Sequence, residues 1–545
     1  MTSHTAVTGG AAVVRALVAN GVDVVFGIPG THNLEIYRYL TGSPIRHVTP
    51  RHEQGAGYAA DGYARTTGRP GVCVTTSGPG LTNISTAAAT AYADSIPLLV
   101  ISPGVPRGLE RADVGWLHEV KDQQAHMDNL LDRSIRVADA AEAYAAIGET
   151  FARWRVERPR PVHIEVPVDV LDGGWDGSTP PAPEPGEVPR PDNAALDKAA
   201  ALLREAGSAV VVLGGGTRGA AGPALRLVEA LDAPVLTTMN GKGVVPETHP
   251  LAVGAAVRFA VAQRLVADAD VALLVGTEWA DSDLWGGSVT PRGAVIRVDI
   301  DARQLDKNIP ATVALHGDAG ATLDGLADRL ADRSGPDRDG AGPDRDGAGP
   351  GGDGAGRAAA ARAEVETAAL ADGAAWRSVQ DVLRAALPAD TIVAGDSAQV
   401  SYYGTAHFWP MGRPGQFLYP VGYATLGYGL PAAIGAKIGN PDRAVITLVG
   451  DGGFLFSVQE LVTAVEQRLP IPVVVMNNHG FAEIREGMDA RGIARLGVDL
   501  VTPDFAALGR ACGGHGVRLA SVDGLSAAVT AALRADGPTV IEVVV

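Results

Sequence analysis

Short apolar runs of strand length alternate with helical patterns along most of the chain. VDVVFG at 22–27 is followed by a turn, IPG, and then by apolar positions at helical spacing. GVCVTT at 71–76 is followed by the turn SGPG, an alanine-rich helical stretch and a further strand-like run, IPLLVIS at 96–102. Strands joined through helices pair in parallel, because a right-handed crossover returns each strand to the same sheet. The pattern therefore predicts a parallel α/β sheet.

The same alternation recurs in two further blocks. PVHIEVPVDV at 161–170 reads as the last strand of the first block, and a second block begins with SAVVVLGGG at 208–216. Strands of the third block are predicted at 390–396, 443–451 and 471–478. The fold class predicted for the chain is α/β, with three doubly wound parallel-sheet domains.

Composition shifts suggest where these blocks end. A stretch rich in Pro and Gly follows the first block, and the heptapeptide GPDRDGA occurs twice in succession at 335–348. Such a repeat buries too little apolar area to offset the entropy of ordering it, which indicates a flexible linker. The predicted domains are 1–178, 190–330 and 359–545, with the linker at 331–358.

Overall composition narrows the class of protein. Of the 545 residues 46% are hydrophobic and 20% charged, as in globular proteins, and the net charge of −17 argues against nucleic-acid binding. The N-terminus lacks the basic lead of a signal peptide, and no apolar run is long enough to span a membrane. Cys73 and Cys512 show no metal-ligand or disulfide spacing. We therefore expect a soluble cytoplasmic protein with neither nucleic-acid nor membrane partners.

An acid and an amide close two neighbouring strands of the third block. Asp451 follows AVITLVG, and Asn478 follows IPVVVMN. In a right-handed strand–helix–strand unit both residues lie at the carboxyl edge of the sheet, where ligands bind. Carboxylate, amide and carbonyl oxygens suit Mg²⁺, while Gly452 and Gly453 allow close approach of a diphosphate to the next helix. The stretch predicts a magnesium–diphosphate site.

The connecting helix is predicted over SVQELVTAVEQ. Its Ser457 and Glu460 have the S-x-x-E spacing of a capping box.

The two ends of this segment also resemble a family signature. With 24 residues between GDG and NN, the stretch resembles the signature of thiamine diphosphate enzymes, and RHEQGAGYAADGYARTTGRPGVCVTTSGPGLTN at 51–83 resembles the pyrimidine-binding domain of the acetolactate synthase group. The resemblance covers about residues 10–540. It implies pyrimidine-binding, middle and diphosphate-binding domains in that order, with thiamine diphosphate and Mg²⁺ as cofactors. It also implies a homodimer at least, commonly a homotetramer, with active sites between subunits.

The resemblance assigns roles to individual residues. Glu53 would be the catalytic acid at the cofactor pyrimidine, Leu426 the apolar wedge beneath its rings, and the carbonyl of Ala424 an acceptor for its amino group. Without the resemblance, Glu53 reads as a solvated helix-start glutamate and Leu426 as a core leucine. The implied metal ligands are Asp451, Asn478 and the carbonyl of Gly480. Further implied cofactor contacts are Pro29, Asp396, Ser397, Gln399, Gly450, Gly452, Gly453 and Phe481.

The middle block raises two other cofactors. GGGTRG at 214–219 fits a dinucleotide-binding glycine pattern, but the strand after it lacks the acid that would bind a ribose, so a nicotinamide dehydrogenase is disfavoured. GKGVVPETHPLAVG at 241–254 resembles a loop that holds FAD in acetolactate synthases. GTEWADSDLWGG at 276–287 departs from the arginine-containing stretch used nearby in that group, so we predict no required flavin.

Chemistry implied by the family begins when the cofactor ylid adds to a 2-oxo acid, and loss of CO₂ leaves an enamine. A decarboxylase protonates the enamine, whereas a carboligase couples it to a second carbonyl. NNHGFAEIREGM at 477–488 resembles the GY-x-x-IR pattern of 5-guanidino-2-oxopentanoate decarboxylases, with Phe481 in place of tyrosine. This favours non-oxidative decarboxylation of a 2-oxo acid with a long or guanidino side chain. The alternatives are a carboligase and a catalytically silent homologue; Glu53 and the metal signature argue against the latter.

Two histidines and four acids are candidates for the reaction and substrate. His32 and His118 could protonate the reacting carbon, or serve only as hydrogen-bonding loop residues. Carboxylates suit a cationic substrate tail, although solvated surface acids are the simpler interpretation. The candidates are Glu119, Asp122, Glu483 and Glu486.

Overall fold

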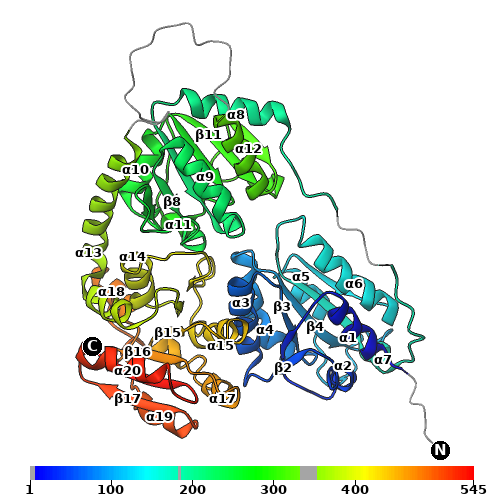
Figure 1. Cartoon of the computed structure of the whole chain (residues 1–545). Helices are drawn as coiled ribbons and strands as arrows, with labels where there is room; N and C mark the ends of the chain where they lie inside the picture. The colour runs from blue at the N-terminus through cyan, green and yellow to red at the C-terminus, as the bar shows by residue number, and fades with distance from the viewer. Residues whose placement is uncertain (1–6, 182–185, 332–352) are drawn as a thin grey trace, which may run out of the picture. The chain divides into compact units, whose positions relative to one another are not determined.

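Three six-stranded sheets make up the protein, as the sequence predicted (Figure 1). The computed structural model describes residues 7–181, 186–331 and 353–545. Most of the linker predicted at 331–358 lies outside these residues, but its two ends are helical. The C-terminal end is part of a helix that begins at Gly354, because the Asp353 side chain accepts a hydrogen bond from the Gly356 N–H and caps it.

The first sheet has the strand order β2-β1-β3-β4-β6-β5, and all its pairings are parallel. The residues of its central strands β1, β3 and β4 are mostly apolar and all buried, as parallel sheets covered by helices on both faces require. The strands are β1 (Val24–Gly27), β2 (Arg46–Val48), β3 (Gly71–Val74), β4 (Leu98–Gly104), β5 (Arg133–Arg136) and β6 (Val162–Pro167). The helices are α1 (Gly9–Ala19), α2 (Leu34–Leu40), α3 (Glu53–Thr67), α4 (Pro79–Ala93), α5 (Gln123–Asp128), α6 (Ala140–Arg153) and α7 (Val168–Asp172).

The second sheet has the order β12-β11-β10-β7-β8-β9, and leucine, valine and alanine side chains form the core beneath it. The strands are β7 (Ala209–Leu213), β8 (Val235–Thr237), β9 (Ala252–Gly254), β10 (Val271–Val275), β11 (Ala294–Asp299) and β12 (Val313–His316). The helices are α8 (Asn193–Glu205), α9 (Ala221–Leu231), α10 (Ala260–Asp268), α11 (Asp281–Leu284), α12 (Ala319–Ala331) and α13 (Gly354–Ala386).

The third sheet has the order β14-β13-β15-β16-β18-β17. The strands are β13 (Ile392–Gly395), β14 (Phe417–Leu418), β15 (Val445–Gly450), β16 (Pro472–Asn477), β17 (His515–Leu519) and β18 (Thr539–Val544). The helices are α14 (Ala406–Phe408), α15 (Gly429–Gly439), α16 (Asp451–Phe454), α17 (Glu460–Glu466), α18 (Ala482–Ala490), α19 (Phe505–Ala511) and α20 (Leu525–Ala532). None of the helices in the described ranges combines the length and apolar character needed to cross a membrane.

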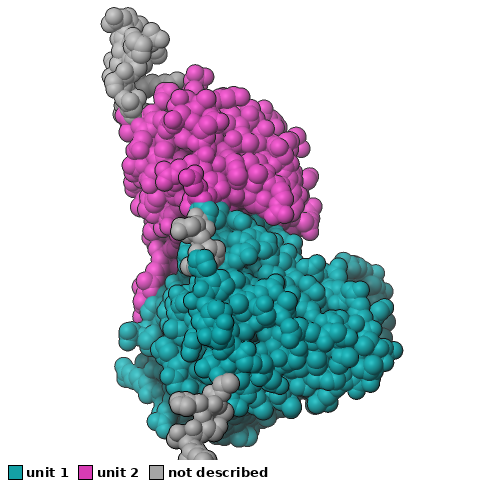
Figure 2. All heavy atoms as spheres, turned by 90° about the vertical axis from the view of Figure 1, so that its right-hand side faces the viewer, with its two compact units in different colours: residues 1–186, 391–398, 423–545 teal, residues 187–390, 399–422 magenta. Residues whose placement is uncertain are grey.

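The chain divides into two compact units, coloured teal and magenta in Figure 2. The first unit contains residues 1–186, 391–398 and 423–545, and the second contains residues 187–390 and 399–422. The first predicted domain therefore shares a compact unit with most of the third, whereas residues 359–390 and 399–422 of the third belong to the second unit. Their exact boundaries stay a prediction.

Within the first unit, α3 and α15 pack at backbone contact distance. A Cβ atom at Gly62 would lie 2.2 Å from the carbonyl oxygen of Ala432, and one at Gly435 would lie 1.7 Å from that of Ala59. Neither position leaves room for a methyl group. The crossing therefore depends on a glycine from each helix.

A buried polar network crosses the same helix pair. The Tyr428 hydroxyl donates to Asp61 Oδ1 at 2.5 Å, and Arg65 binds both Asp61 at 2.6 Å and Asp94 at 2.8 Å. Burial of these charges is tolerated because each carboxylate is paired with the guanidinium.

Tyr428→Phe should destabilise the first compact unit by about 1.5–3 kcal/mol, because it removes a buried hydrogen bond to a charged group. The check is the thermal unfolding midpoint, with Tyr423→Phe, whose side chain is half-exposed, as the matched control. Equal midpoints for the two variants would contradict a stabilising role for this bond.

Candidate active site

Asp451 and Asn478 lie at one edge of the third sheet, as predicted. β15 and β16 pair in parallel with Gly450 opposite Met476, so the residues that follow them leave the sheet side by side. Asp451 is only 1% exposed, and its Oδ2 accepts a hydrogen bond from the Gly480 N–H at 2.9 Å. Burial raises the pKa of the Asp451 carboxyl, while the N–H groups of Gly452 and Gly480 oppose that rise.

Two further polar groups converge on this carboxylate. The side-chain amide of Asn478 faces the carbonyl oxygen of Gly480 and Oδ1 of Asp451, and when it is rotated its nitrogen donates to them at 2.9 and 3.3 Å. With the amide oxygen turned inward instead, the same three residues present an oxygen donor set that suits Mg²⁺. No cluster of three His, Cys, Asp or Glu side chains suited to a metal occurs among the described residues, so this mixed set is the candidate metal site.

Glu53 begins α3 and is largely buried. Its Oε2 accepts a hydrogen bond from the Asn83 amide at 2.9 Å. The first turn of α4 closes on the other oxygen, since a Cβ atom at Gly80 would lie 3.2 Å from Oε1. α4 begins at Pro79, within the predicted turn SGPG, because proline is well suited to the first position of a helix.

Glu460 fixes the chain just before Glu53. Its Oε1 accepts from the N–H groups of Arg51 and His52, each at 3.0 Å, and its Oε2 accepts from the Thr463 hydroxyl at 2.7 Å. Burial raises the pKa of Glu460 to about 7. The third block of the chain thus holds the start of the helix that carries Glu53.

The predicted capping box at Ser457 and Glu460 is therefore wrong. α17 begins at Glu460 itself and has no side-chain cap, and the Glu460 N–H bonds to the carbonyl of Ser457 instead. The Glu460 carboxylate binds two N–H groups from outside its own helix, and this leaves it unavailable for the local motif.

The loop before α15 is organised by Asp396. The fully buried Asp396 carboxylate accepts from the N–H groups of Gly427 at 3.0 Å and Ser397 at 2.8 Å. Burial raises its pKa to about 6. Leu426 is half-buried on this loop, and Ala424 has a φ of 48°, a conformation that costs energy for a residue other than glycine. Strain of this kind collects at ligand-binding loops.

The other predicted cofactor contacts come from several parts of the chain. A Cβ atom at Gly452 would lie 2.5 Å from the Phe481 ring, and one at Gly453 would lie 2.8 Å from Asp396 Oδ2. These neighbours leave no room for a side chain at either position. Pro29 is exposed after β1, Gly450 ends β15, and Gln399 lies in the second compact unit. Their contacts with a cofactor stay a prediction.

Three family models match this chain in order along its length. They describe the N-terminal TPP binding domain, the central domain and the C-terminal TPP binding domain of thiamine pyrophosphate enzymes, and they match residues 7–127, 196–326 and 397–543. The chain belongs to the thiamine pyrophosphate enzyme family. The resemblance found in the sequence is therefore confirmed.

Relatives in this family match nearly the whole chain. A probable 2-ketoarginine decarboxylase of Pseudomonas aeruginosa is 43% identical over 538 residues, which cover 98% of this chain and 93% of the relative. A probable acetolactate synthase large subunit of Methanocaldococcus jannaschii is 32% identical, with 98% and 92% covered. An acetolactate synthase large subunit of Parasynechococcus marenigrum is 34% identical, with 98% and 87% covered.

In this thiamine pyrophosphate enzyme, the two candidate histidines lie together. His32 Nδ1 is 2.6 Å from the Ser77 hydroxyl, which is 3.5 Å from His118 Nδ1, and the two imidazole centroids are 5.0 Å apart. Burial, followed by the nearby His118, lowers the pKa of His32. The Trp116 ring stacks on the His32 ring, with 4.5 Å between the two ring centroids, and orients it.

Two of the acids proposed for a cationic substrate tail hold their own loops. Glu119 accepts from the Trp116 N–H at 2.9 Å, and Asp122 caps α5 through the Ala125 N–H at 2.9 Å. Glu483 and Glu486 lie exposed on α18. Sequence reasoning passed over Glu165, a glutamate buried in β6, although a charged residue within the apolar run PVHIEVP is itself a signal.

Glu460→Gln should remove a pH dependence of stability. Because the pKa of Glu460 is about 7 in the folded protein and has its ordinary value of 4.5 in the unfolded chain, the folded state binds more protons between these values. The stability that protonated Glu460 contributes to the folded state is fully present below pH 4.5 and is lost as the pH rises through about 7. Unfolding midpoints measured from pH 5 to 8 should fall more for the wild type than for the variant, and parallel curves would disprove the assignment.

Proposed function

We propose that this protein is a thiamine diphosphate- and Mg²⁺-dependent enzyme that removes CO₂ non-oxidatively from a 2-oxo acid with a long, guanidino-type side chain. The observation that carries the proposal is the match, over 98% of the chain, to a relative named as a probable 2-ketoarginine decarboxylase. The oxygen atoms that converge at Asp451 support the cofactor assignment independently.

Asp451, Asn478 and the carbonyl of Gly480 would hold Mg²⁺, which would in turn hold the diphosphate. Gly452 and Gly453 follow Asp451 in the short helix α16, where Phe481 and Asp396 leave no room for a side chain. When bound, thiamine diphosphate supplies a carbon nucleophile and an acceptor for the electron pair that departing CO₂ leaves behind.

Glu53 would hold a proton at the pyrimidine ring of the cofactor. Asn83 donates to Oε2 and so orients the carboxyl group, while Oε1 faces the turn at Gly80. Leu426 would support the bent cofactor from below, and the Ala424 carbonyl would accept from its amino group. Glu53 and the metal ligands of one site would come from different subunits, in a cytoplasmic homodimer or homotetramer.

His32 and His118 would deliver the proton that replaces CO₂. Their shared contact with Ser77 offers a short route for a proton between the two rings. The lowered pKa of His32 makes its protonated form a stronger acid. A purely hydrogen-bonding role for either ring is the alternative.

Carboligation is the second candidate, and it is favoured by the acetolactate synthase relatives that are 32% and 34% identical over nearly the whole chain. The two reactions differ in what meets the reacting carbon, a proton or a second carbonyl group.

Product analysis separates them. The protein is incubated with thiamine diphosphate, Mg²⁺ and a panel of 2-oxo acids that includes 5-guanidino-2-oxopentanoate, and the products are identified by mass. Free aldehyde from the guanidino acid is expected. Predominance of coupled products would overturn the ranking of the two reactions.

Glu53→Gln should lower kcat by a factor on the order of 100 to 10,000, the usual contribution of a positioned acid or base. Cofactor affinity, measured by titration calorimetry, should change little because the diphosphate is held elsewhere. The control is Glu149→Gln, an exposed glutamate on α6. Wild-type turnover in Glu53→Gln would show that another group activates the cofactor.

A further inference from the structure

A cavity of about 250 Å³ lies at the carboxyl ends of β4 and β6, beside the 105–122 segment. Ser77 and His118 of the histidine cluster line it, and so does Gln123, which accepts from the Gly78 N–H at 2.9 Å. Gly78 begins the turn that closes on Glu53 through Gly80. The segment from Ser77 to Gly80 therefore contacts both the cavity lining and Glu53.

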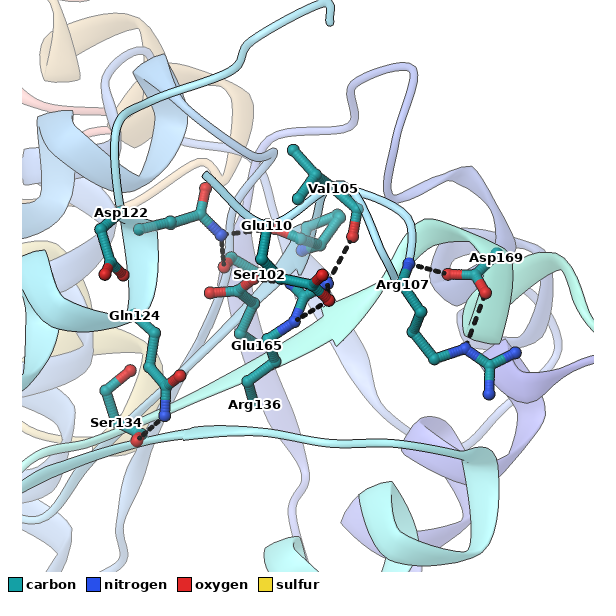
Figure 3. Close-up of polar contacts among 12 residues, drawn as sticks. Ser102, Val105, Arg107, Glu110, Asp122, Gln124, Ser134, Arg136, Glu165 and Asp169 are labelled. Carbon is teal, nitrogen blue, oxygen red and sulfur yellow. Dashed lines mark hydrogen bonds and ion pairs between the residues drawn. The ribbon is translucent and has the colours of Figure 1, made fainter. Parts of the chain in front are cut away.

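Two guanidinium groups in the cavity are already paired. Arg136 binds Glu110 at 2.7 Å, the Val105 carbonyl at 2.7 Å and Glu165 Oε1 (Figure 3). Arg111 pairs with Asp122. Lys121 lies exposed at the rim. An anionic ligand would have to break these pairs to reach a buried cation.

Glu165 differs from the other side chains around it. It is 2% exposed, and of the described side chains that line the cavity it alone has a buried oxygen, Oε2, with no donor at hydrogen-bond geometry. Burial raises the pKa of the Glu165 carboxyl, and Arg136 and the Gln123 amide oppose that rise. The Glu165 carboxylate and the Arg136 guanidinium lie directly against Gly104, where a Cβ atom would be 2.0 Å from Oε1 and 2.5 Å from Arg136 Nη1. A buried carboxylate oxygen without a donor is costly, so a donor from a ligand would be favourable there.

We propose that this cavity binds the cationic tail of the substrate, with Oε2 of Glu165 accepting from its guanidinium or ammonium group. The proposal rests on the proposed function for the identity of the substrate. Arg136 shows that a guanidinium fits against the other oxygen of the same carboxylate. The neighbouring histidines would place the reacting carbon at one end of the substrate, with its tail in the cavity at the other.

The first measurement uses a probe that cannot react. 4-Guanidinobutanoate carries the tail but no 2-oxo group, and its binding to the full-length protein loaded with thiamine diphosphate and Mg²⁺ is measured by calorimetry. Glu165→Gln should weaken binding by about 10- to 100-fold, as expected for a hydrogen bond to a charged group. Asp169→Asn is the control, because it releases Arg107 from the same segment outside the cavity.

A second variant covers the case in which Glu165→Gln fails to fold. Val120→Phe fills the cavity from the 105–122 segment without removing the carboxylate, and it should abolish probe binding while thiamine diphosphate still binds. Unchanged probe affinity in Val120→Phe or in a folded Glu165→Gln, or an equal loss in Asp169→Asn, overturns the proposal.

Kinetics separate this proposal from the proposed function. Glu165→Gln should raise the KM for 5-guanidino-2-oxopentanoate. It should leave kcat/KM for 2-oxohexanoate, whose alkyl side chain is uncharged, near the wild-type value. If the wild type decarboxylates neither acid but binds the probe in a Glu165-dependent way, the proposed function fails and the cavity assignment stands. Equal losses for both acids would count against a tail-binding role.

Discussion

The convergence of the polar groups of Asp451, Asn478 and Gly480 is the constraint on which this site depends. The parallel register of β15 and β16 brings the first two residues together, and the backbone after Asn478 adds a carbonyl from Gly480. Rotating the Asn478 amide turns its nitrogen toward the other two oxygens, and the unrotated amide completes a set of three oxygens that suits a cation. The family model that matches residues 397–543 describes this part of the chain as a TPP binding domain.

The remaining parts of the site are held by carboxylates whose role is structural. Asp396 shapes the loop that carries Leu426, and Glu460 holds the start of α3, where Glu53 lies. Both acids are buried and have raised pKa values, which means that the fold meets a desolvation cost to keep them in place. That cost is offset by backbone N–H groups that would otherwise lack partners.

Periodicity and local spacing were sufficient to predict the three sheets and the placement of Asp451 beside Asn478, because a strand–helix–strand unit is a local structure of fixed handedness. Non-local partners were not predictable. The S-x-x-E spacing at Ser457 indicated a local cap, whereas Glu460 binds N–H groups about 400 residues away in the sequence. Glu165 was overlooked because its significance comes from Arg136 and Gly104, which β-strand pairing brings beside it.

The glycine contacts between α3 and α15 restrict which domains can be exchanged between this protein and its relatives. Gly62 and Gly435 each lie against backbone of the opposite helix, so the two surfaces fit only as a matched pair. A chimaera that takes one of these domains from a relative with a bulkier residue at either position would force the helices apart. Shuffling experiments would therefore have to transplant both helices together.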